Sequence, residues 1–335
     1  MFTAIPSQSY PADLAPVILF VYNRPEHTEK MLNSLVNNHL ADRSVLYIFA
    51  DGIRENATET EKNAVLLTRQ IISQKNWCKT VHIIEADRNL GLAQAIVNGV
   101  TQTLQKHGKV IVLEDDLLLA PGFLSYMNQS LDLYANSPQV MHISGYIFPI
   151  DTHNFKENTF FYNQASSWGW ATWQRAWNFF ENDASKLIDG ISQIPNGKSY
   201  FNIDDGFDFF GLLEENAAGT KKTWAVKWQA SILLKNGLCL HPKKTLLNNI
   251  GNDGSGVHKG FTNKYLNPAI ADFLEVKPIP LQESLEARAL MKQFYLSNLP
   301  KKSLIPLWFK QSIANALPNK LKSRLFQWLM RKKVR

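Results

Sequence analysis

Short apolar runs alternate with amphipathic stretches along the first third of the chain. The apolar runs are rich in Val, Ile, Leu and Phe, a composition typical of strands that are buried on both faces. These runs span residues 17–22, 45–50, 81–85 and 110–113. The stretches that carry apolar residues at helical spacing span residues 26–36, 64–73 and 91–105. Strands that alternate with helices predict an α/β fold, a mostly parallel sheet flanked by helices.

The pattern becomes less regular from about residue 124. Helices are predicted over 123–134, 207–215 and 224–236, and strands over 140–144, 160–162 and 238–241. We expect one domain over 1–260, with a first half over about 15–122 and a second half over about 123–260. A C-terminal extension follows over 261–300, and a separate tail over 301–335.

Polar side chains follow three of the predicted strands in the first half. Ligands of open α/β sheets bind at the carboxyl ends of strands, so these side chains are expected to share one site. They are Asn23 and Arg24 after the first strand, Asp51 after the second, and Glu114, Asp115 and Asp116 after the fourth. Adjacent carboxylates at the end of a buried strand need a positive partner, and their oxygens suit Mg²⁺ or Mn²⁺. The alternatives are a solvated acidic turn, an ordinary turn at Asp51 and a surface salt bridge at Arg24.

The net charge of +7 does not describe the body of the chain. Twelve of the 36 Lys and Arg residues follow Glu286, after which there is no Asp or Glu. The preceding part therefore has 24 basic and 29 acidic residues. Because the basic residues lie in the tail and no RNA- or DNA-binding motif is present, the sequence argues against a nucleic-acid partner.

The tail over 302–335 has the pattern of a basic amphipathic helix. Leu321, Leu325, Trp328 and Leu329 fall on one stripe among Lys and Arg residues. This pattern predicts binding to an anionic membrane surface, and packing on the acidic body is the alternative. The first apolar run is too short for a signal peptide, and two cysteines suit a reducing compartment. We expect a cytoplasmic protein that associates peripherally with the inner face of the membrane.

The segment VIVLEDDLLLAPGFLSYM, residues 110–127, carries a family resemblance. It resembles the GT-A glycosyltransferases, above all the group of N-acetylglucosaminyltransferase I and its bacterial relatives. That group has an apolar strand, an acidic triplet and Ala-Pro before an aromatic-containing helix. The segments SSWGWATW, TWAVKW and NNIGNDGSGVH resemble bacterial members thought to build surface polysaccharides. The resemblance covers roughly residues 15–260.

The resemblance implies a metal-dependent glycosyltransferase that uses Mn²⁺ or Mg²⁺. It would move a hexosyl or N-acetylhexosaminyl group from a nucleotide-sugar donor to a glycan hydroxyl; the acceptor would be a lipid-linked glycan, and the resemblance favours a UDP-sugar and an inverting reaction. Asp116 would bind the metal, Asp115 the ribose or the water shell of the metal, and Glu114 the donor sugar. Asp51 would accept from the nucleobase, and Arg24 would lie near the base or the phosphates.

Two further segments have counterparts in GT-A enzymes. Asn89 lies in a segment that resembles the Asn-x-Gly element before a helix, where anionic groups are favoured, although a plain helix cap explains it equally well. His258 ends a Gly-rich segment and would bind the metal or a phosphate, with Asp253 as the second choice. A solvated loop histidine is the alternative.

The tryptophans between residues 168 and 177 have two interpretations. Each indole can fill a core, yet the apolar face of a sugar also stacks on such rings. We expect Trp168 and Trp170 to line the acceptor site, and Trp173 and Trp177 to belong to the core.

The segment over 224–228 departs from the family. The N-acetylglucosaminyltransferase I group has an Asp between paired tryptophans there, whereas this chain has no carboxylate. An inverting transfer needs a base for the acceptor hydroxyl proton. The sequence offers Asp208 first and Asp205 second. Lys227 is expected to face the diphosphate and neutralise the leaving group.

Two rival functions stay open. A sugar-phosphate nucleotidyltransferase shares the sheet and the acids, but the loop at 23–26 is not the Gly-rich, Arg-containing loop of that class. A non-catalytic sugar-nucleotide-binding protein is the other rival, because the expected base is missing.

Overall fold

The computed structural model describes residues 13–254, 262–268 and 270–298. His258 and the tail over 301–335, to which metal-binding and membrane-binding roles were assigned, lie outside the described residues. Within the described part of the chain, no helix is long and apolar enough to cross a membrane.

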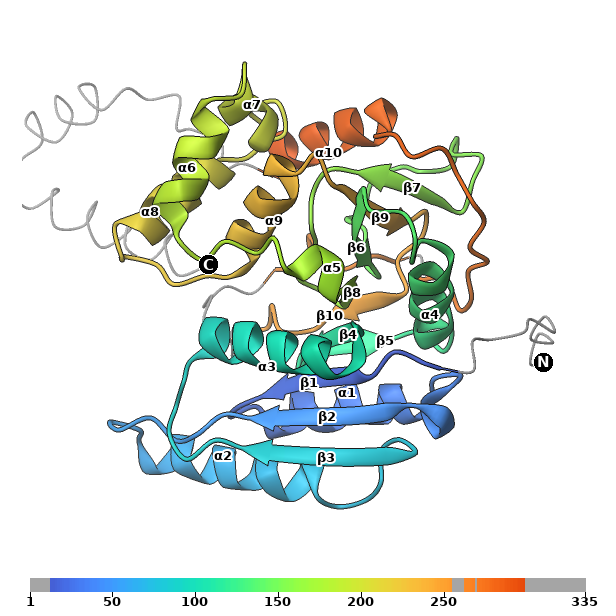
Figure 1. Ribbon diagram of the computed structural model, residues 1–335. Helices are drawn as coiled ribbons and strands as arrows, with labels where there is room; N and C mark the ends of the chain where they lie inside the picture. The colour runs from blue at the N-terminus through green and yellow to red at the C-terminus, as the bar shows by residue number, and fades with distance from the viewer. Residues whose placement is uncertain (1–12, 255–261, 269, 299–335) are drawn as a thin grey trace, which may run out of the picture. The chain divides into compact units, whose positions relative to one another are not determined.

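An eight-stranded sheet forms the centre of the described structure (Figure 1). Its strands lie in the order β3-β2-β1-β4-β8-β6-β9-β7. Their bounds are β1 (Val17–Val21), β2 (Val45–Ala50), β3 (Thr80–Glu85), β4 (Lys109–Glu114), β6 (Val140–Ser144), β7 (Thr159–Tyr162), β8 (Trp170–Trp173) and β9 (Leu238–Pro242). Each strand predicted from an apolar run is present, with its bounds within two residues of the expected ones.

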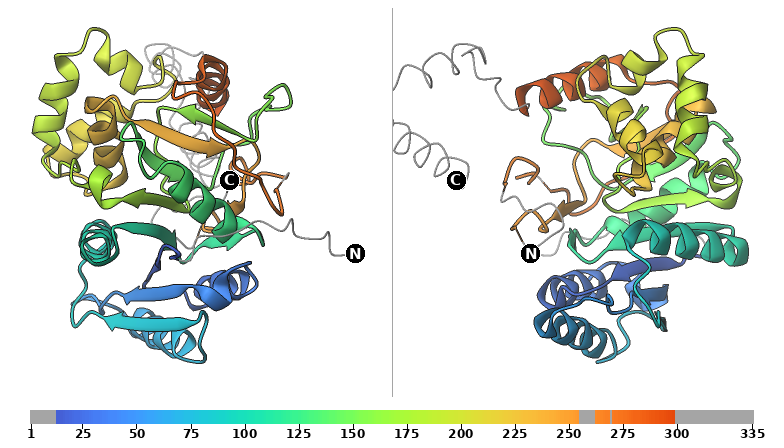
Figure 2. Two further views of the ribbon diagram at one scale, coloured as in Figure 1. Left: turned by 45° about the vertical axis from the view of Figure 1, so that its right-hand side comes forward. Right: turned by 90° about the vertical axis from the view of Figure 1, so that its left-hand side faces the viewer.

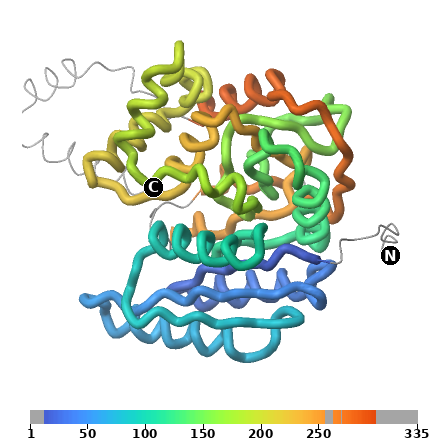
Figure 3. Tube along the Cα trace, viewed as in Figure 1, coloured from blue at the N-terminus to red at the C-terminus, as the bar shows by residue number. Residues whose placement is uncertain are grey.

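The first four strands are all parallel, with β1 between β2 and β4. Parallel neighbours need crossover connections, which the intervening helices supply. Figure 3 shows this alternation as the blue-to-teal course of the chain. In the second half, β8 lies antiparallel between β4 and β6, β9 is parallel to β6, and β7 is antiparallel to β9. The predicted α/β fold with a mostly parallel sheet is therefore confirmed.

Helices cover both faces of the sheet (Figures 1 and 2). One core joins β1, β2 and β4 to α1 (Pro25–Val36), α2 (Glu59–Ile72) and α4 (Phe123–Leu133). The core on the opposite face joins β1 and β4 to α3 (Leu92–His107), α5 (Gln174–Trp177) and α9 (Ala225–Leu234). Successive side chains of a strand point to opposite faces, so Val17 and Leu19 enter the first core and Ile18 and Phe20 the second.

Three shorter helices and the last described helix complete the second half. They are α6 (Ala184–Ser192), α7 (Gly197–Phe201), α8 (Phe209–Ala217) and α10 (Leu285–Asn298), and a short 3₁₀ turn η1 (Ala41–Arg43) precedes β2. Helices α6 to α9 share a small core of their own, and α10 packs on residues of β7. Of these helices, the sequence predicted only α8 and α9.

A two-stranded ribbon next to the sheet was not predicted. Strand β5 (Leu117–Leu119) pairs antiparallel with β10 (Leu247–Asn249), which places Asn249 opposite Leu117. The ribbon begins directly after the acidic triplet and brings the chain beyond residue 249 back to it. This ribbon builds one wall of the candidate site.

Candidate active site at the end of β4

The acidic triplet lies where the buried strand β4 ends. Glu114 is the last residue of β4 and is half-buried, and Asp115 and Asp116 form the turn into β5. The Asp115 residue is only 9% exposed, and its carboxylate accepts a hydrogen bond from the backbone N–H of Tyr22 after β1. Adjacent parallel strands thus end at one cluster of carboxylates, as the sequence predicted.

Arg24 is the positive partner of this cluster. Its Nη1 lies 2.9 Å from Oδ2 of Asp116 and 3.7 Å from Oδ1 of Asp115. Its Nη2 donates to the backbone carbonyl of Gly251 at 3.3 Å and lies 3.7 Å from Asp253. The structure thus brings Arg24 and the acids together, although Arg24 and Asp116 are 92 positions apart in the sequence.

Residues 249–254 form the return segment, which runs from the end of β10 over Asp116. Asn249 Nδ2 donates to Oδ1 of Asp116 at 3.0 Å, while its own Oδ1 accepts from the backbone N–H of Gly251 at 2.8 Å. A Cβ at position 251 would lie 2.0 Å from Oδ2 of Asp116, so a side chain there would displace this carboxylate. The sequence had singled out this segment by its resemblance, but it had given Asn249 no role.

His27 is a site residue that the sequence analysis missed. Its Nε2 lies 3.1 Å from Oδ2 of Asp253, and its side chain is 12% exposed. The available signal was its spacing from Arg24, because residues three apart on the first turn of a helix share one face. Arg24 and His27 therefore both reach the return segment that leads toward His258.

The cluster carries more negative charge than Arg24 neutralises. Burial, followed by repulsion from Asp116, raises the pKa of Asp115 to about 7, and Arg24 limits that rise. Burial and the two neighbouring carboxylates also raise the pKa of Glu114 well above its usual value. Such shifts mark a site where additional positive charge would be stabilised.

The donor set at the cluster suits a hard divalent cation that arrives with its ligand. Within residues 13–254, 262–268 and 270–298, no three His, Cys, Asp or Glu side chains are grouped to hold a metal ion by themselves. Mg²⁺ in nucleotide sites needs only one or two carboxylates, since phosphate oxygens and water complete its shell. Asp115 and Asp116 meet that requirement, and the surplus charge of the cluster favours a dication there.

Asp51 holds the loop before α3. Its Oδ1 accepts from the backbone N–H groups of Gly52 and Leu90, and its Oδ2 from the backbone N–H of Gly91 and from Asn89 Nδ2. All four donors lie within 3.0 Å. Asp51 and Asn89 therefore meet, as expected of one site, but each holds the other in place. Asn23, half-buried, follows β1 one residue before Arg24.

The tryptophan cluster divides between core and surface. Trp170 is fully buried and stacks between His142 and Trp224, so neither of its faces is open to a sugar. Its expected acceptor role is therefore corrected to a core role, because β8 lies inside the sheet. Trp173 and Trp177 are buried as expected. Trp168 stays half-buried and packs against Tyr146, with ring centroids 4.6 Å apart.

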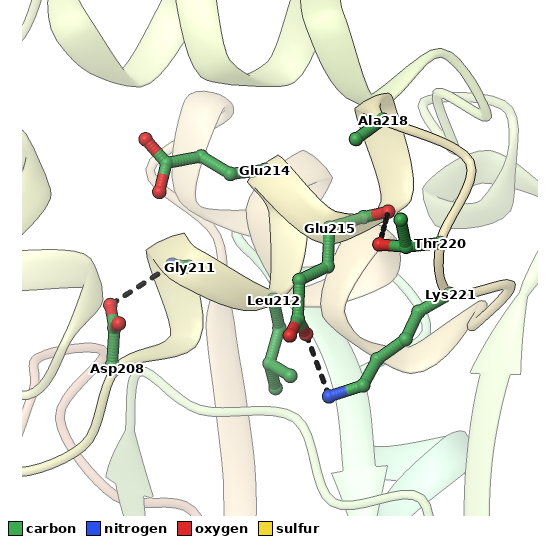
Figure 4. A pocket seen from close by; sticks show the side chains of 8 residues that line it. All are labelled: Asp208, Gly211, Leu212, Glu214, Glu215, Ala218, Thr220 and Lys221. Carbon is green, nitrogen blue, oxygen red and sulfur yellow. Dashed lines mark hydrogen bonds and ion pairs between the residues drawn. The ribbon is translucent and has the colours of Figure 1, made fainter.

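The two candidate bases have structural partners. Asp208 is the N-cap of α8, and its Oδ1 accepts from the backbone N–H of Gly211 at 2.9 Å. Asp208 lines an open cavity of about 520 Å³ with Glu214, Glu215 and Lys221 (Figure 4). Asp205 accepts from Ser199 Oγ at 2.8 Å. The cavity is open to solvent, which permits an acceptor hydroxyl to approach Asp208.

Lys227 lies on α9, in the second half of the described chain. Its Nζ donates to Oδ1 of Asn182 at 3.0 Å, and burial lowers its pKa. The structure thus places its ammonium group against the segment before α6 rather than at the carboxylates after β4, where we expected it to face the diphosphate.

Comparisons with known proteins give remote likenesses only. No protein-family model and no curated protein matches the sequence. Among solved structures, the 1–349 fragment of S. aureus TarS is 11% identical, with 72% of this chain and 61% of that chain covered and a TM-score of 0.40. Another structure of S. aureus TarS is 14% identical, with 43% of this chain and 22% of that chain covered and a TM-score of 0.26.

Two other solved structures resemble the chain at a similar distance. A UDP-glucose pyrophosphorylase in complex with UDP-glucose is 12% identical, with 68% of this chain and 90% of that chain covered and a TM-score of 0.32. An active-site mutant of LgtC is 10% identical, with coverages of 54% and 69% and a TM-score of 0.32. Likeness at this level assigns no activity, so the function is argued from the site.

Proposed function

We propose that the protein is a glycosyltransferase that moves a sugar from a nucleotide-sugar donor to a glycan hydroxyl. The observation that carries the proposal is the acid cluster at the ends of β1 and β4. Three carboxylates adjoin one another there, Arg24 contacts two of them, and burial and repulsion from Asp116 raise the pKa of Asp115. A diphosphate with its divalent cation supplies the missing positive charge and uses the oxygens that the cluster offers.

Asp116 and Asp115 would hold the cation, and Glu114 would lie toward the donor sugar. Mn²⁺ or Mg²⁺ bound there would neutralise the diphosphate leaving group. Asp51 and Asn89 fix the loop before α3, which would border the nucleobase. A UDP-sugar remains the preferred donor on the sequence resemblance alone.

The acceptor would meet the second half of the molecule. Trp168 belongs to a partly buried aromatic cluster with Tyr146, Phe148 and Tyr265, and such rings suit the apolar face of a sugar. Asp208, which lines the cavity at α8, is the first candidate for the base, and Asp205 is the second. An inverting reaction requires one of them to take the acceptor proton.

A non-catalytic sugar-nucleotide-binding protein is the second candidate function. One observation favours it. The carboxylate of Asp208 accepts a hydrogen bond as the N-cap of α8, and that of Asp205 accepts one from Ser199. Both candidate bases thus accept internal hydrogen bonds.

Binding is tested by thermal shift with a panel of nucleotide sugars, with and without Mn²⁺. We expect at least one donor to raise the melting temperature only when Mn²⁺ is present. Asp116→Ala should abolish that shift and keep the fold, whereas Asp132→Ala, an exposed acid on α4, should preserve it. A donor-dependent shift of equal size in Asp116→Ala would exclude the assignment.

A further inference from the structure

Arg24 is fixed in front of the acids by its backbone. Pro25 follows it at the first position of α1 and disfavours helical geometry at Arg24, which has φ −122° and ψ 69°. Its carbonyl accepts from both the backbone N–H and the Oγ1 of Thr28 at 2.9 Å. Only the long side chain of Arg24 is therefore left to move.

The guanidinium group occupies the oxygens that a cation would need. Nη1 lies 2.9 Å from Oδ2 of Asp116 and 3.7 Å from Oδ1 of Asp115, while Gly251 closes on Oδ2 from the side of the return segment. A divalent cation and a guanidinium group repel each other at such distances. The two cannot occupy this position together.

We propose that Arg24 is an exchangeable counter-ion that holds the cation position on Asp115 and Asp116 until the donor arrives. This inference rests on the proposed function of the site. When the cation binds the two carboxylates, the guanidinium group transfers to the diphosphate, whose oxygens it can bind bidentately. The same movement breaks the contacts of Arg24 with the carbonyl of Gly251 and the carboxylate of Asp253.

If Arg24 exchanges in this way, its replacement should change the affinity for Mn²⁺ and the affinity for UDP in opposite directions. Arg24→Gln removes the guanidinium group that competes with the cation, so Mn²⁺ alone should bind about tenfold more tightly. This gain is expected when the state with open Asp115 and Asp116 is no longer the minor one. The same variant loses a phosphate contact, so UDP at saturating Mn²⁺ should bind about tenfold more weakly. A purely structural role of Arg24 would weaken both.

The experiment titrates Mn²⁺ into the full chain and follows the free ion by electron paramagnetic resonance, then measures UDP binding by calorimetry at saturating Mn²⁺. Lys30→Gln is the matched control, because it removes one positive charge from an exposed position of the same helix. This control should keep the wild-type affinity for Mn²⁺ alone.

Circular dichroism checks that each variant is folded. If Arg24→Gln does not fold, Arg24→Lys replaces it, since a lysine keeps the charge but cannot bridge Asp116 and Gly251, and its Mn²⁺ affinity should also rise. Unchanged or weaker binding of Mn²⁺ alone to a folded variant overturns the exchange and leaves the proposed function standing. No Mn²⁺ binding to either wild type or variant overturns both.

Discussion

Replacing Arg288 by methionine should lower the free energy of unfolding by about 1–3 kcal/mol, because its carboxylate partners, the largely buried Glu283 and the 43% exposed Asp204, would lose their charged partner. Arg288 is 5% exposed. Its Nε and Nη2 donate to the two carboxylate oxygens of Asp204 at 2.9 and 2.8 Å, and Nη2 also donates to the carbonyl of Tyr200 at 2.7 Å. Its Nη1 lies 3.3 Å from Glu283, whose side chain is 13% exposed. Methionine fills much of the same volume, so the loss of stability measures the cost of leaving the carboxylates of Asp204 and Glu283 without their charged partner.

The same arginine holds a strained turn. Ile203, Asp204 and Asp205 all have positive φ, at 54°, 52° and 64°. The left-handed region costs roughly 1 kcal/mol or more for each residue with a Cβ, so the turn needs outside support. Arg288 supplies that support at Asp204, and the turn leads directly to Asp208. The variant should therefore also reduce transfer, if Asp208 or Asp205 is the base.

Urea denaturation followed by circular dichroism measures the effect. Glu286→Gln, at an exposed position two residues earlier, is the control and should change stability by less than about 0.5 kcal/mol. Arg288→Lys should recover only part of the loss, because an ammonium group cannot match the paired contacts. A loss below about 1 kcal/mol in Arg288→Met would refute the reasoning.

Three further predictions concern other parts of the chain. Burial lowers the pKa of His241 from 6.5 to about 4, so its contribution to stability is complete above pH 6.5 and is lost as the pH falls toward 4. The difference in unfolding free energy between wild type and His241→Gln should therefore shrink by about 2 kcal/mol from pH 7.5 to pH 5. Parallel pH profiles of the two proteins would contradict this. Asp208→Asn should slow transfer by about 10²–10⁴-fold with nearly unchanged donor affinity, whereas the same effect in Asp205→Asn alone would reverse the order of the two candidates. Removing residues 302–335 should leave a folded protein that no longer sediments with anionic liposomes, and equal sedimentation of both forms would exclude the membrane role.

The sequence predicted the sheet because each parallel strand is a separate apolar run. It also placed Arg24, Asp51 and the acidic triplet at one edge, since the ends of parallel strands converge. The ribbon of β5 and β10 was missed because strands of three residues leave no periodicity to detect. Its consequence, the contact of Asn249 with Asp116, was therefore also missed.

Other differences depend on partners far apart in sequence. Three of the four donors to Asp51 lie 38 to 40 positions away, so its role as the support of a loop was not visible locally. Trp170 was expected at the acceptor site because sugars stack on indole rings, yet β8 pairs inside the sheet and buries it. The N-cap role of Asp208 was missed because the helix was predicted to begin at residue 207, whereas α8 begins at Phe209.

Turnover of a bound nucleotide sugar is the decisive test of glycosyl transfer by this protein. The release of nucleoside diphosphate is followed for each donor that binds in the presence of Mn²⁺, with wild type and Asp116→Ala compared and a panel of glycan acceptors supplied. We expect Mn²⁺-dependent release by the wild type, faster with an acceptor, and none by Asp116→Ala. A donor that binds but stays intact with every acceptor would contradict this expectation and would identify a sugar-nucleotide-binding protein instead.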